Sequence, residues 1–122
     1  MALLLTPRAL AQRGEFYYQL SSMIRAGLPI IAALQTVGKS PPSASYRKPV
    51  AQMLVELKGG NSFVGALEAV GDWLPIFDKA LLEAGEKSGR LDQCFRLLSS
   101  YYEERAKLVR EVIGQMIYPF CI

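Results

Sequence analysis

The stretch LLEAGEKSGRLDQ, residues 81–93, places two glycines, Gly85 and Gly89, between apolar segments with helical spacing. Glycine adopts the left-handed conformation that closes a helix, so the stretch predicts a helix that ends at Gly85 and a turn at Gly89. A second helix follows, and Asp92 in its first turn interacts favourably with the helix dipole. The stretch is therefore interpreted as a corner between two helices.

The carboxylates of this stretch, Glu83, Glu86 and Asp92, limit its chemistry. They repel phosphate, which argues against a nucleotide-binding loop. Glu86 and Asp92 are candidate ligands for a divalent cation, but calcium takes about six to eight oxygen ligands. A calcium site would therefore need two copies of the chain at a dimer interface, and no other cofactor is expected. Glu86 has no evident local role, so we expect it to act beyond folding.

Outward from this corner, apolar residues recur at spacings of three and four, and no strand-like alternation is sustained. The expected helices cover residues 7–26, 29–38, 44–57, 62–70, 75–85 and 91–112. The third begins near Tyr46 or is kinked at Pro49, and Phe77, Leu81 and Leu82 line the apolar side of the fifth. Helices with short connections predict an all-α six-helix bundle.

Two segments that follow expected helix ends share a pattern. RAGLPIIAAL, residues 25–34, and KSGRLDQCFRLL, residues 87–98, each place a small residue and a glycine before an apolar helix. This similarity raises the alternative of two related three-helix halves, although it is too short to establish a repeat.

The composition argues against an enzyme. The 122 residues correspond to one domain and include no histidine, which excludes a Ser-His-Asp triad and a His-ligated zinc site. Cys94 and Cys121 are distant in sequence and lack a metal-binding motif. The segment ALQTVGKS, residues 33–40, has alanine in place of the first glycine of a nucleotide-binding P-loop, and prolines follow it. We therefore expect no catalysis.

Charge and hydropathy point to a partner surface. Hydrophobic residues make up 51% of the chain, which is high for a free-standing domain. Residues 1–60 carry seven basic and two acidic side chains, whereas residues 61–122 carry seven and nine. This asymmetry favours either head-to-tail pairing of two copies or contact with anionic lipid. The basic residues are scattered, so nucleic acid is not an expected partner.

The end of the chain differs from the rest. Residues 113–122 are apolar and uncharged, but a bilayer span needs about 20 such residues. We therefore expect a six-helix domain over residues 1–112 and the start of a truncated transmembrane helix over residues 113–122.

Three segments carry a family resemblance. FYYQLSSMIRAGLPIIAAL covers residues 16–34, PIFDKALLEAGEKSGRLDQCFRLLSSYYEER covers residues 75–105, and IGQMIYPFCI covers residues 113–122. The first two resemble the two signatures of the type II secretion system F family. The third is similar to the place where the first transmembrane helix of that family begins, with Tyr118-Pro119 as its marker.

The resemblance implies a non-enzymatic cytoplasmic domain of a bacterial inner-membrane platform protein, which serves type II secretion or type IV pilus assembly. The implied partners are the assembly ATPase, other inner-membrane platform proteins and a second copy of the chain. The resemblance leaves open whether the machine is a secretion system or a pilus, and whether this is the first or the second domain of its parent.

The residues expected to contact partners lie at two corners. One corner contains Arg25, Gly27 and Pro29, and the other contains Glu83, Glu86 and Asp92. If the helix pairs are related by a pseudo-two-fold axis, the corners lie close together and Arg25 meets Glu83 or Glu86. The alternative function is a helical module that binds a membrane surface, which the basic first half and the apolar end would favour.

Overall fold

The computed structural model describes the backbone of residues 6–121 and the side chains of residues 6–112. It contains six α-helices and one short 3₁₀ helix, and no strand occurs in the described backbone. The elements are α1 (Pro7–Arg25), α2 (Ile30–Lys39), η2 (Ala44–Tyr46), α3 (Arg47–Lys58), α4 (Phe63–Val70), α5 (Ile76–Ser88) and α6 (Leu91–Cys121). The predicted all-α architecture with six helices is confirmed.

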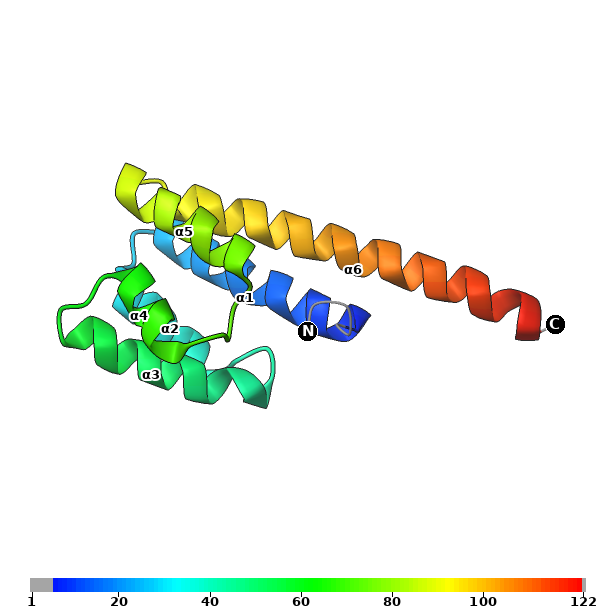
Figure 1. Cartoon of the computed structure of the whole chain (residues 1–122), viewed down its shortest axis with the longest axis horizontal. Helices are drawn as coiled ribbons and strands as arrows, with labels where there is room; N and C mark the ends of the chain where they lie inside the picture. The colour runs from blue at the N-terminus through cyan, green and yellow to red at the C-terminus, as the bar shows by residue number, and fades with distance from the viewer. Residues whose placement is uncertain (1–5, 122) are drawn as a thin grey trace.

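The helices form a closed circuit of packed neighbours. Each helix contacts the next one along the chain, and α6 returns to contact α1. Figure 1 shows that α1 and α6 run antiparallel, with α5 beside the first half of α6 and with α2, α3 and α4 on the other side of α1. The start of α6 therefore lies beside the end of α1, and the second half of α6 leads away from the other helices.

Aromatic side chains from several helices meet in the core. Phe16 lies 5.2 Å from Tyr46, and Phe63 lies 5.5 Å from Phe95, measured between ring centroids. All of these rings are at most 5% exposed. Tyr17 of α1 stacks on the same Phe95 of α6, with 6.1 Å between ring centroids. Burial of one such apolar side chain is worth about 1.5–3 kcal/mol, so these contacts hold α1, α4, α6 and η2 around one core.

The starts of the helices follow the sequence closely. Thr6 caps α1 by accepting a 3.1 Å hydrogen bond from the Ala9 amide, and Ser62 caps α4. Pro29 precedes α2 in an extended conformation, so this helix begins at Ile30, one residue later than expected. Pro49 lies in the first turn of α3, where its missing N–H is not needed, so the third helix begins after Tyr46 and is not broken by the proline.

Three helices end with the same glycine motif. Gly27, Gly60 and Gly89 have φ values of 100°, 98° and 75°. In each case the amide of the next residue donates to the carbonyl five positions earlier, at 2.8–3.0 Å. This pattern satisfies carbonyls that the helix end leaves free. Because it also ends α3, capping alone explains the pattern shared by residues 25–34 and 87–98, and two related halves are not required.

The prediction that Gly85 ends the fifth helix is wrong, since α5 continues to Ser88 and Gly89 is its cap. Gly85 instead lies buried where α5 packs on α6. A Cβ atom at this position would lie 2.5 Å from Sγ of Cys94, closer than any real contact. Glycine is therefore needed here for the close approach of two helices.

Candidate protein-contact site

Glu86 joins α5 to the start of α4. The Phe63 amide donates to Oε2 of Glu86 at 2.6 Å, and the Val64 amide donates to Oε1 at 3.2 Å. The Ser62 hydroxyl accepts from the Gly65 amide at 2.9 Å. The first amides of a helix have no partner within the helix, and a negative charge there is favoured by the dipole. The expectation that Glu86 has no local role is therefore wrong.

The two predicted corners lie at the same end of the bundle, as Figure 1 shows. The Ser21 hydroxyl of α1 is 3.4 Å from the carbonyl oxygen of Asp92 in the first turn of α6. The cause is the antiparallel packing of α1 on α6, so no pseudo-two-fold axis is needed to bring the corners together.

The expected ion pair between the corners does not form. Among the side chains of residues 6–112, the ion pair present joins Lys87 to Glu83, with 3.1 Å between Nζ and Oε1. Glu86 is bound to backbone amides instead. Arg25 is exposed at the end of α1, and Gly27 and Pro29 shape the turn that follows it.

The predicted cation site is incomplete within one chain. In the part of the chain that the structure describes, no group of three acidic or cysteine side chains is placed to hold a metal ion. Both oxygens of Glu86 already accept hydrogen bonds from α4. A cation shared by Glu86 and Asp92 would therefore need ligands from a second copy, and it stays a prediction.

A buried carboxylate ties three helices together, and sequence reasoning missed it. Asp78 of α5 is 1% exposed. The Tyr17 hydroxyl of α1 donates to Oδ2 of Asp78 at 2.8 Å, and the Tyr102 hydroxyl of α6 lies 2.8 and 2.9 Å from the two oxygens. Arg13 lies over the Tyr102 ring, with Cζ 5.5 Å from the centroid. A buried polar group is tolerated when it is bonded in this way.

Burial dominates the titration of this cluster. It raises the pKa of Asp78, while the hydrogen bonds from Tyr102 and Tyr17 and the charge of Arg13 act in the opposite direction. Burial also raises the pKa of Tyr17 and Tyr102, and the neighbouring Asp78 adds to both shifts. The two hydroxyls therefore stay protonated and act as hydrogen-bond donors at neutral pH.

Helical periodicity contained a signal for Asp78. The buried residues of α5 are Asp78, Leu82 and Gly85, which follow each other at spacings of four and three. Phe77, which was expected to face the core, is instead 62% exposed. Because Asp78 is charged, the predicted buried side of α5 passes through Phe77, one position before Asp78.

Phe77 is one of several large apolar side chains that are exposed on α5 and α6. Ile76 and Phe77 at the start of α5 are 85% and 62% exposed, and Phe77 lies 6.2 Å from Tyr101 of α6, between ring centroids. Leu108 and Val112 continue the same side of α6 and are 53% and 54% exposed. We call these five exposed residues of the two helices the α5–α6 strip. Exposed apolar side chains gathered in this way are typical of protein or membrane contacts.

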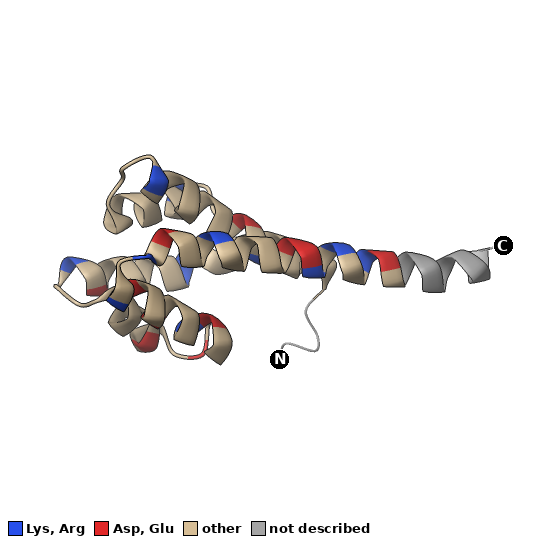
Figure 2. Ribbon diagram, turned by 90° about the horizontal axis from the view of Figure 1, so that it is seen from above, with Lys and Arg blue, Asp and Glu red and all other residues tan. Residues whose placement is uncertain are grey.

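The strip lies on a helix with charges of both signs. Figure 2 shows acidic and basic residues interspersed along the exposed part of α6. Within the described residues, none of the helices combines the length and the apolar character that a bilayer span requires. The prediction of a transmembrane start at residues 113–122 concerns side chains outside the described residues.

These features define a class: a small all-α domain with large apolar side chains and charges of both signs exposed on its surface. Residues 16–122 match the family described as Type II secretion system (T2SS), protein F, and the chain belongs to this family. The resemblance stated from the sequence is confirmed.

The relatives come from secretion and from pilus assembly. The chain is 31% identical over 104 residues to Type II secretion system protein F of Aeromonas hydrophila, which covers 85% of this chain and 27% of the relative. It is 28% identical over 107 residues to the Type 4 fimbrial assembly protein PilC of Pseudomonas putida, with 88% and 27% covered. The Escherichia coli K12 protein transport protein HofC homolog is 26% identical over 108 residues, with 88% and 27% covered. The chain thus spans about a quarter of the length of these relatives.

Proposed function

We propose that this chain is a non-enzymatic cytoplasmic domain of an inner-membrane assembly platform for type II secretion or type IV pili. It acts by binding the assembly ATPase and other platform proteins. The α5–α6 strip carries the proposal, because a domain of this family exposes five large apolar side chains on two neighbouring helices, two of which, Phe77 and Tyr101, meet at the surface. Burial of such side chains supplies most of the free energy of protein association.

The proposed partner lays a helix on the strip. Ile76 marks the start of α5, so the side of α6 that bears Leu108 and Val112 continues past the start of α5 and is not covered by that helix. A partner helix laid there takes the place that a longer α5 would occupy. Its apolar side chains pack against Phe77 and Tyr101 at one end and against Val112 at the other.

The corner residues have a secondary part in this proposal. Arg25 and Glu83 are partly or fully open to solvent and are proposed as polar contacts around a partner. Gly27, Pro29 and Glu86 act mainly by shaping the corners, and Asp92 adds a negative charge beside them. A second copy of the chain is the proposed partner for this end of the bundle.

Site-specific photocrosslinking in cells that carry the intact machine tests the proposal. A photoreactive phenylalanine analogue replaces Ile76, which is 85% exposed and makes few contacts that matter for folding. The matched control replaces Val55, which is 68% exposed on α3. We expect an adduct with the assembly ATPase from the Ile76 position, identified by mass spectrometry, and none from Val55.

Each outcome of this experiment is decisive. No adduct at Ile76, or equal adducts from Ile76 and Val55, contradicts a specific contact at the strip. An adduct that contains a second copy of the chain and no ATPase contradicts ATPase binding at the strip and assigns the surface to dimer formation.

A further inference from the structure

A groove of about 390 Å³ lies between α2 and α3, on helices that the α5–α6 strip does not use. Its walls come from Gln35, Gly38 and Lys39 of α2 and from Arg47, Val50, Ala51 and Leu54 of α3. The α3 residues follow each other at spacings of three, one and three, so they form one side of the helix. The groove extends along α3 from Arg47 to Leu54, seven helical rises or about 10 Å.

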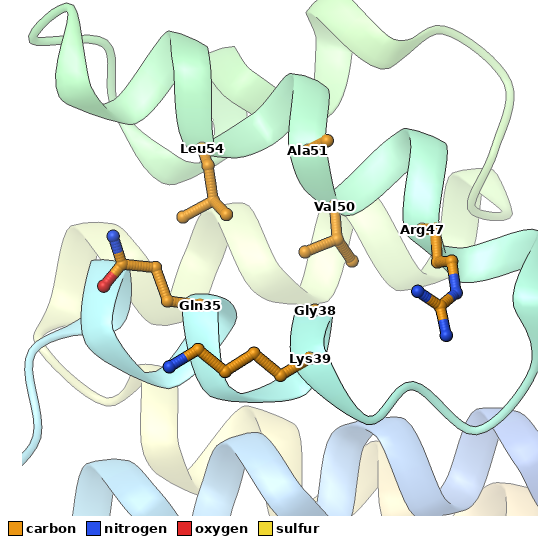
Figure 3. A pocket seen from close by; sticks show the side chains of 7 residues that line it. All are labelled: Gln35, Gly38, Lys39, Arg47, Val50, Ala51 and Leu54. Carbon is orange, nitrogen blue, oxygen red and sulfur yellow. The ribbon is translucent and has the colours of Figure 1, made fainter.

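The groove combines an aliphatic wall with two cations. Figure 3 shows Val50 and Leu54 pointing from α3 toward α2. The ammonium of Lys39 extends back along α2 toward Gln35, while the guanidinium of Arg47 hangs from the start of α3 at the other end. Apolar surface therefore lies between two separated positive charges.

These charges have no counter-ion in the surrounding sequence. The acidic residues nearest along the chain are Glu15 and Glu56, and all charged residues between them are basic. Within residues 6–112, neither Lys39 nor Arg47 takes part in an ion pair or in a side-chain hydrogen bond. Both side chains are exposed and available to an anion.

Arg47 is also unfavourably placed for the helix that carries it. It is the first residue of α3, and the first turn of that helix contains no acidic residue. A cation at a helix N-terminus opposes the helix dipole at a cost of about 0.3–1 kcal/mol. Residues that break a local rule without a compensating contact are expected at functional positions.

We propose that the α2–α3 groove binds a short segment of another protein in which an aliphatic residue stands between two carboxylates. The carboxylates pair with Lys39 and Arg47, and the aliphatic side chain lies on the partly exposed Leu54 and the exposed Ala51. Val50 is 1% exposed and belongs to the core beside them. A length of about 10 Å accommodates roughly three residues in extended conformation. A lipid headgroup fits less well, because one phosphate needs its cations gathered at one point and here they lie at opposite ends of an apolar wall.

Fluorescence anisotropy with the whole chain tests the proposal. The probe is a dye-labelled peptide of alternating glutamate and leucine, compared with peptides of alternating lysine and leucine and of alternating glutamate and serine. We expect binding of the glutamate–leucine peptide alone, weakened by salt because exposed charges are screened. Vesicles of phosphatidylglycerol and phosphatidylcholine form a separate arm.

Two neighbouring variants localise the site. Arg47→Glu reverses a charge in the groove, and Lys48→Glu makes the same change on the next residue of α3, outside the groove. Both place glutamate in a first helical turn, where it is favourable for folding. Because the paired charge is lost, we expect Arg47→Glu to weaken peptide binding about tenfold or more and Lys48→Glu to change it less than about threefold.

Three results would overturn the proposal. The first is no binding of the glutamate–leucine peptide at about 1 mM, a concentration that would detect even weak association. The second is equal loss in the two variants, which would mean nonspecific attraction to a basic surface. The third is vesicle binding that depends on Arg47 without peptide binding, which would assign the groove to anionic lipid. None of these results bears on the α5–α6 strip, so this proposal and the proposed function fail separately.

Discussion

The Tyr17 hydroxyl of α1 donates a 2.8 Å hydrogen bond to the Asp78 carboxylate of α5, across 61 positions of sequence. Tyr102 of α6 donates to the same carboxylate, so one buried group fixes the positions of three helices. A hydrogen bond restricts the register of packed helices more than apolar contact does, because it requires a defined distance and direction. The start of α5, which carries Ile76 and Phe77 of the strip, is thereby held against α6.

Removal of one donor tests this link. In Tyr17→Phe the Asp78 oxygen loses a buried partner, and we expect the free energy of unfolding to fall by about 1–2 kcal/mol. Urea unfolding followed by circular dichroism measures the change. Tyr18→Phe is the control, because Tyr18 is 57% exposed and the same atom is removed. Equal effects of the two substitutions would contradict a structural role for the hydrogen bond.

The pH dependence of stability tests the state of Asp78. Burial raises its pKa above the ordinary value of 3.8, so the folded protein binds this proton more tightly than the unfolded chain does. A carboxyl group whose pKa is raised by folding contributes to the free energy of unfolding. This contribution is complete below the pKa of the unfolded chain and is lost as the pH rises through the pKa of the folded protein. Relative to Asp78→Asn, which does not titrate, the wild-type chain should therefore lose stability as the pH rises above 3.8.

Urea unfolding of both chains at several pH values from about 3.5 to 7 measures this difference, in which the other carboxylates cancel. A wild-type chain that gains stability relative to Asp78→Asn as the pH rises would show that the pKa of Asp78 is lowered by folding. The hydrogen bonds from Tyr17 and Tyr102 and the charge of Arg13 would then outweigh burial.

Glu86 gives a third prediction, on the stability of α4. Glu86→Ala leaves the Phe63 and Val64 amides without their acceptor, and we expect a loss of about 2 kcal/mol in the free energy of unfolding. Glu83→Ala is the control one turn earlier. It removes an exposed ion pair with Lys87, which is worth about 0.3–0.5 kcal/mol. If Glu86→Ala costs no more than Glu83→Ala, the carboxylate does not cap α4 in solution.

The sequence predicted what depends on local spacing. Thr6 and Ser62 cap helices because a hydroxyl reaches an amide three residues later, and Gly27 ends α1 because the left-handed conformation favours glycine. These contacts lie within a few residues, and apolar periodicity supplied the number of helices.

Contacts between distant residues were not predictable in the same way. The capping of Phe63 by Glu86 joins positions 23 apart, and the bond from Tyr17 to Asp78 joins positions 61 apart. Such pairs follow from how the helices pack, which one sequence does not state. Charged residues are mostly exposed, so Asp78 was expected to face solvent. For this reason Phe77 was placed on the buried side of α5, although Asp78 is buried there and Phe77 is exposed.

The contact between Gly85 and Cys94 gives the last prediction. A methyl group at residue 85 would meet Sγ of Cys94 at 2.5 Å, so Gly85→Ala forces α5 away from α6 at a cost of about 1–3 kcal/mol. Cys94→Ala removes that sulfur, and the double variant should be more stable than the sum of the single changes allows. Gly38→Ala is the control, since its Cβ would lie at an ordinary 3.5 Å from Val50, and should stabilise α2 by about 0.5–1 kcal/mol. A double-mutant cycle measured by urea unfolding gives the coupling, and effects of Gly85→Ala and Cys94→Ala that add within about 0.3 kcal/mol would show that the two residues do not meet.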